Sequence, residues 1–252
     1  MNPERNRPPM REALHRVVLE SRQRTYSNLL VVLTLYLVVV PFVPVLPRLA
    51  WIDDYLLVLV LLASLYSISG DRTHLFVGLV LGFPAIASRL VTAHLRVVTV
   101  APATLAALSV FAFLAYLIYR VMRDVLWGRR RTGERIIGAI VAYLLIGLQW
   151  SLIYGFVEHV HPGSFAIPAN VLPQGNVQIA AAPVSVFVYF SFVTLATLGY
   201  GDITPISAAA RTFAWSEAIV GQLFIAVTIA RLVGIHAAEM AASSRDPGAT
   251  DT

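Results

Sequence analysis

Six long apolar stretches set the limits on how this chain folds. A helix of about 20 apolar residues crosses the hydrocarbon core of a membrane. With 58% hydrophobic and 13% charged residues, the chain has too few charges to cover a soluble domain of its size. We therefore expect an all-α membrane protein with six transmembrane helices, surrounded by lipid. The predicted spans cover residues 28–46, 51–69, 74–93, 97–119, 135–157 and 208–236.

Arginines predict how these spans are oriented. Residues 1–27 and residues 120–135 each contain six arginines, whereas residues 157–205 contain no lysine or arginine. Cytoplasmic loops of membrane proteins carry the excess of positive charge, so the two basic segments indicate topology rather than nucleic-acid binding. We expect a multi-pass protein of the cell membrane with both termini in the cytoplasm. Residues 10–24 fit either an amphipathic helix on the membrane surface or a solvated basic tail.

A short apolar segment between the last two spans has a different character. Residues 183–196 begin with a proline, which suits the first turn of a helix, and are too few to cross a membrane. The sequence "TLGYGD" follows at residues 197–202. Irregular backbone at membrane depth is tolerated only where protein buries it or where it lines a water-filled path. The pattern predicts a re-entrant helix followed by a non-helical strand that faces water or ions.

The residue types of this strand favour cation binding through oxygen atoms. Gly199 and Gly201 permit backbone angles that other residues resist, and they alternate with Leu198 and Tyr200. This alternation allows successive carbonyls to turn toward one axis, and Thr197 adds a hydroxyl oxygen. Oxygen dipoles without a fixed charge suit a monovalent cation that must bind and also leave. The negative end of the preceding helix dipole favours a cation at the same place.

The stretch "TLATLGYGDITP" at residues 194–205 resembles the selectivity filter of the potassium channel superfamily. The resemblance covers about the second half of the chain. It implies a homotetrameric pore, because each chain supplies one filter strand, with K⁺ as the permeant ion and no cofactor. Val193 stands where many members of the superfamily carry a polar group. By position, the resemblance assigns ion coordination to Thr197, Leu198, Gly199, Tyr200 and Gly201, and filter support to Asp202.

The resemblance also assigns residues in the last span. Gly221 matches the flexible glycine of the pore-lining helix, and Gln222 is expected to line the cavity or to join helices by a hydrogen bond. Glu217 lies inside the same span, where an ionisable residue is rare and faces protein or water. We expect it to act as a packing group or hydrogen-bond brace behind the filter rather than as a cavity site.

The layout of six spans predicts a domain organisation without a voltage sensor. A sensor helix requires several arginines, yet the fourth span contains none and has Arg96 and Arg120 only at its flanks. We expect weak or no voltage dependence. The predicted parts are a basic segment (1–27), a four-span domain (28–122), a cytoplasmic linker (123–134), a pore domain (135–236, with pore helix 183–196, filter 197–202 and inner helix 206–236) and a cytoplasmic tail (237–252).

Other functional classes have less support in the sequence. We find no His–Glu metal motif, no phosphate-binding loop ending in lysine and no catalytic triad pattern, so we expect no enzyme. A secondary transporter would show broken helices in both halves. His159 and His161 are interpreted as surface residues rather than a metal site. The sequence therefore predicts a potassium-selective ion channel, with a less selective monovalent cation channel as the alternative.

Overall fold

The computed structural model is mostly helical. It describes residues 25–45, 51–68, 76–84, 86–87, 100–128, 132–168 and 184–243. The expected amphipathic segment, much of the third predicted span and Pro183 lie outside the described residues. Within the described part, three helices are long and apolar enough to cross a membrane, with apolar windows Tyr26–Val43, Gly133–Val160 and Ala208–Ile235.

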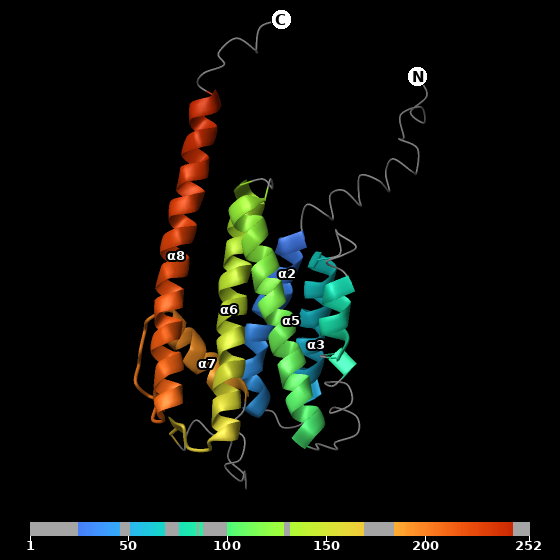
Figure 1. The fold of residues 1–252 in the computed structure, drawn as a ribbon, viewed down its shortest axis with the longest axis vertical. Helices are drawn as coiled ribbons and strands as arrows, with labels where there is room; N and C mark the ends of the chain where they lie inside the picture. Colours follow the sequence, from blue (N-terminus) through green and yellow to red (C-terminus); the bar gives the residue numbers. More distant parts are fainter. Residues whose placement is uncertain are drawn as a thin grey trace, which may run out of the picture.

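The N-terminal part consists of apolar helices that pack together. Helix α2 covers Thr25–Val39, the 3-10 helix η2 covers Val40–Val45, and helix α3 covers Trp51–Ile68. Proline cannot donate the backbone hydrogen bond that a helix interior needs, and Pro41 and Pro44 accordingly lie just after the last α-helical turn of α2. Helix α5 covers Val100–Trp127 and crosses in front of α2 in this view (Figure 1).

The helices on either side of the predicted linker 123–134 extend into it. Helix α5 continues to Trp127, and helix α6, which covers Thr132–Val160, begins before residue 135. Polar residues continue these helices because they make helix-compatible contacts, such as the ion pair of 3.5 Å between Arg120 and Asp124. Only residues 128–131 separate the two helices, so α5 and α6 form an antiparallel pair.

The remaining elements surround a short helix. Helix α7 covers Val184–Leu195, and the two-residue strands β1 (Phe165–Ala166) and β2 (Thr204–Pro205) pair antiparallel, with Phe165 opposite Pro205. Helix α8 covers Ala208–Ser243 and therefore extends beyond residue 236, into the predicted tail. It begins where the Ser207 hydroxyl accepts the N–H of Ala210, a bond of 3.1 Å that caps the helix.

Two apolar clusters hold these elements together. The larger one joins α2, α3, α5 and α6 through fully buried side chains such as Leu33, Leu61, Phe113 and Leu145. The smaller one, here called the aromatic cluster, contains Tyr154, Phe165, Phe187 and Phe190, whose rings meet mostly edge to face. Figure 1 shows that α8 stands at one side of the bundle, with α7 between it and α6.

Candidate functional site

The backbone leaves α7 through a tight turn directly before the predicted filter. The Val193 carbonyl accepts the N–H of Leu198 at 2.9 Å and that of Gly199 at 3.4 Å, and the Thr194 carbonyl accepts the N–H of Thr197 at 2.9 Å. These bonds use carbonyls at the end of the helix that have no partner within the helix. They fix the first residues of the 197–202 segment against the C-terminus of α7.

The backbone of the 197–202 segment alternates between two conformations. Thr197, Gly199 and Gly201 have φ angles of 57°, 58° and 78°, whereas Leu198 and Tyr200 lie between them without a positive φ. In an ordinary extended strand, successive carbonyls point to opposite sides. A left-handed conformation at every second residue lets successive carbonyls point to the same side instead. Glycine is therefore needed at these positions for its backbone angle and not for lack of space, since a β-carbon at either one would meet no atom within 4 Å.

The carbonyl oxygens of this segment remain available for a ligand. Within the described residues, no group donates a hydrogen bond to the carbonyls of Thr197 through Gly201. The segment is exposed in the single chain, including the side chains of Leu198 (56%) and Tyr200 (67%). The described residues contain no cluster of three or more acidic or histidine side chains that could hold a metal ion.

Asp202 holds the far end of the segment. Its carboxylate accepts the hydroxyl hydrogen of Tyr189 on α7 at 2.6 Å and the N–H of Ile203 at 3.0 Å. The hydrogen bond from Tyr189 lowers the pKa of Asp202 below its usual value. Ile203 is buried and leads directly into β2. The chain is therefore tied to α7 on both sides of the alternating residues.

A buried carboxylate next to the predicted surface residues His159 and His161 supports the neighbouring strand. Glu158, in the last turn of α6, accepts the N–H of Gly163 at 2.8 Å and that of Phe165 at 3.2 Å. The Ser164 carbonyl in turn accepts the N–H of Ile206 at 2.7 Å. His159 and His161 are exposed, so only Glu158 turns inward. In the sequence, the inward position of Glu158 is indicated only by its place at the end of a predicted span.

Two predicted residues of α8 contact the start of the segment. An ideal β-carbon at Gly221 would lie 2.4 Å from the carbonyl oxygen of Leu195, so the absence of a side chain lets α8 approach the end of α7. Gln222 donates from its amide nitrogen to the hydroxyl of Thr197 at 3.4 Å. Helix α8 runs without interruption through both residues. In this conformation Gly221 is a site of close packing between helices.

Glu217 links three helices. Its side chain is fully buried, and its two carboxyl oxygens contact the hydroxyl of Tyr154 on α6 and the hydroxyl of Ser191 on α7. The Ser191 hydroxyl also lies 2.7 Å from the carbonyl oxygen of Gly147. Sequence reasoning did not identify these partners, because they are separated from Glu217 by 63 and 26 residues and no local pattern marks them.

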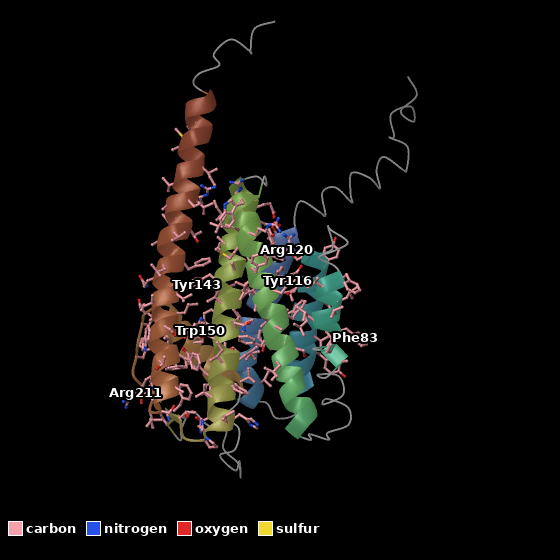
Figure 2. The ribbon with its side chains drawn as sticks, viewed as in Figure 1. Phe83, Tyr116, Arg120, Tyr143, Trp150 and Arg211 are labelled. Atoms are coloured by element: carbon pink, nitrogen blue, oxygen red, sulfur yellow. The ribbon has the colours of Figure 1, made fainter. Side chains whose placement is uncertain are left out.

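Aromatic and arginine side chains join α8 to the rest of the chain. Tyr143 and Trp150 of α6 lie between α6 and α8 (Figure 2), where their rings meet Phe224 and Phe213. Arg231 of α8 donates two hydrogen bonds, of 3.3 and 3.1 Å, to the carbonyl of Leu126 near the end of α5. These contacts fix α8 along one side only.

Comparisons with known proteins match the part of the chain that contains this site. A family model described as "Ion channel" matches residues 178–236. The two pore potassium channel c of Oryza sativa subsp. japonica is 43% identical over 68 residues, which is 27% of this chain and 14% of the rice protein. No solved structure matches. The matched family consists of channels and not of enzymes. Residues 178–236 therefore match an ion-channel domain, and the similarity to a potassium channel lies within about a quarter of the chain.

Proposed function

We propose that the chain forms a potassium-selective channel in which residues 197–201 coordinate the ion. The observation that carries this proposal is the alternating backbone of the 197–202 segment, whose carbonyls accept no hydrogen bond from the described residues. Oxygen dipoles arranged in this way replace the hydration shell of an ion without holding it permanently. The potassium channel in the name of the rice relative supports the choice of ion.

The active form that we propose is a homotetramer. One strand presents its oxygens from one side only, so several copies are needed to surround an ion. The apolar surface of α8 supports this assembly, because Leu223, Val227 and Ile229 are each more than half exposed in the single chain. In the tetramer, α8 and α7 would face the axis, and the N-terminal helices would lie outside, toward lipid. We retain six spans with the re-entrant helix α7 and both termini in the cytoplasm as parts of this proposal.

Further roles follow from the same arrangement. Asp202 would brace the filter through Tyr189, and Gln222 would line the cavity next to Thr197. Gly221 keeps the role of a hinge only if α8 first separates from Leu195. The predicted four-span domain would act as a scaffold with weak or no voltage dependence. A conductance–voltage curve with several gating charges per subunit would contradict this last point.

A matched pair of glycine variants tests the proposal. Gly199 and Gly163 both have a positive φ and open space around the position of a β-carbon. Alanine at either position imposes similar backbone strain, roughly 1–2 kcal/mol, but only Gly199 lies in the proposed filter. In liposomes loaded with K⁺, we expect flux from the wild type and from Gly163→Ala, and little or none from Gly199→Ala. Equal Na⁺ and K⁺ flux through the wild type would favour the less selective cation channel, and a monomeric wild type would contradict the tetramer.

A further inference from the structure

The hydrogen bonds around Glu217 allow its protonation state to be inferred from a count of hydrogens. Three helices meet at this carboxyl group, which has no exposed surface. The contacts form one chain, from the hydroxyl of Tyr154 to one carboxyl oxygen, from the other oxygen to the hydroxyl of Ser191, and from this hydroxyl to the carbonyl of Gly147. Each of these three contacts requires one hydrogen.

An ionised Glu217 leaves one contact without a hydrogen. Tyr154 and Ser191 each have a single hydroxyl hydrogen, and a carboxylate and a carbonyl are acceptors only. Ser191 could then donate its single hydrogen to the carboxylate or to the carbonyl of Gly147, but not to both. A protonated Glu217 completes the chain, because its own O–H donates to Ser191 and Ser191 donates to Gly147. Every polar atom in the chain is then satisfied.

The surroundings offer no charge to stabilise an ionised form. The groups that face Glu217 are Tyr154 and Tyr143 on α6 and Ser191 on α7, all of which are neutral. Within the described residues, no arginine or histidine makes a hydrogen bond or ion pair with it. A buried charge without a partner is strongly unfavourable, whereas a neutral acid with donor and acceptor partners is not.

We propose that Glu217 is a protonated carboxylic acid that positions α7, and with it the 197–202 segment, by donating a hydrogen bond to Ser191. It is a positioning residue, since it touches the ion-binding segment only through α7. Ser191 lies one helical turn before Leu195, whose carbonyl is approached by Gly221. The O–H of Glu217 and the absent side chain of Gly221 therefore set the distance between α7 and α8 at neighbouring turns. The link to conduction rests on the proposed function, but the protonation state does not.

Infrared spectroscopy of the purified protein tests the protonation state without any flux measurement. At neutral pH we expect a carboxylic acid C=O stretching band in the wild type that is lost in Glu217→Gln. The band should remain in Glu134→Gln, a matched control at the opposite end of the bundle from the aromatic cluster. Ser191→Ala should move the band to higher frequency, because it removes the acceptor of the acid hydrogen. Absence of the band in the wild type, or its persistence in Glu217→Gln, overturns the proposal.

A second measurement tests the positioning role. Glutamine has both a donor and an acceptor, so Glu217→Gln should keep at least half of the tetramer yield and K⁺ flux. Methionine has similar length without a hydrogen-bonding group, and Glu217→Met should reduce both more than tenfold. Raising the pH should reduce flux in the wild type before it does so in Glu217→Gln. Equal loss in the glutamine and methionine variants, including failure of both to fold, contradicts the role. If the wild type gives the infrared band but no K⁺ flux, only the proposed channel function is refuted.

Discussion

Helices α6 and α8 have nearly the same hydropathy but occupy different environments in the single chain. Their apolar windows of 28 residues have mean hydropathies of 2.1 and 2.0. Half of the α6 window is buried, compared with 11% of the α8 window. Helix α6 contacts α2, α5, α7 and α8, whereas α8 packs mainly on α6 and α7 (Figure 1). Hydropathy therefore identifies a membrane helix without saying whether protein or lipid surrounds it.

The difference shows which helix has a large uncovered apolar surface in the single chain. Lipid tails are as apolar as leucine, so an exposed apolar face costs little in a membrane, and packing decides which face meets protein. Helix α6 is already surrounded by other helices of the same chain. Most of the apolar surface of α8 has no protein neighbour in the single chain, and this helix lies next to the exposed 197–202 segment. We expect substitutions in the two helices to have effects of different kinds.

The largest difference is expected between two leucines. Leu145 of α6 is fully buried and Leu223 of α8 is 58% exposed. Leu145→Ala should lower the free energy of unfolding by about 2 kcal/mol or more, because it leaves a cavity in the larger apolar cluster. Leu223→Ala should change it by less than about 0.5 kcal/mol but should weaken the proposed tetramer. Reversible unfolding in mixed micelles and gel filtration measure the two quantities. Equal destabilisation would show that the exposed face of α8 is buried in the single chain.

A smaller effect is expected from a comparison of two glycines within α8. Alanine at Gly221 would place a β-carbon against the carbonyl of Leu195, whereas alanine at Gly234 would meet nothing within 4 Å. Gly221→Ala should destabilise the protein by about 1–3 kcal/mol through overpacking. Gly234→Ala should stabilise it by up to about 1 kcal/mol, since alanine favours a helix. Thermal unfolding in detergent checks both values. If Gly221→Ala is neutral, α8 and α7 do not approach as closely as described.

The smallest effect concerns the exposed end of the 197–202 segment. The hydrogen bond from Tyr189 lowers the pKa of Asp202, so Tyr189→Phe should raise this pKa toward the ordinary value of 3.8. A lowered carboxyl pKa means that the bond contributes stability at higher pH and that this contribution is lost as the pH falls through the lowered value. Titration by NMR of labelled aspartate should therefore give a higher midpoint in Tyr189→Phe than in the wild type. Tyr119→Phe, on α5, is the control, and an unchanged midpoint in Tyr189→Phe would contradict the prediction.

Local patterns predicted the elements that local forces determine. The short helix before the glycines and the need for unusual angles at Gly199 and Gly201 follow from residue type alone, and the structure contains both features. Thr197 was predicted as an ion ligand, but its positive φ was not, because threonine rarely adopts that angle.

Helix ends and distant partners could not be read in the same way. Hydropathy marks where a span leaves the membrane, not where its helix stops, and arginine and glutamate are good helix formers. This explains why residues 123–127, 132–134 and 237–243 are helical although they were assigned to a linker and a tail. The partners of Glu217 and the inward turn of Glu158 depend on contacts between helices, which a single sequence does not encode locally.

The bonds from Arg231 to Leu126 have a mechanical consequence. Leu126 belongs to the last turn of α5, whose carbonyls have no partner within the helix and attract a cation. The guanidinium of Arg231 joins the second half of α8 to the end of α5, and both helices also pack on α6. If this half of α8 moves, either the Arg231–Leu126 hydrogen bonds break or the end of α5 moves with it. A displacement of α5 would thus be transmitted directly to α8 through these hydrogen bonds.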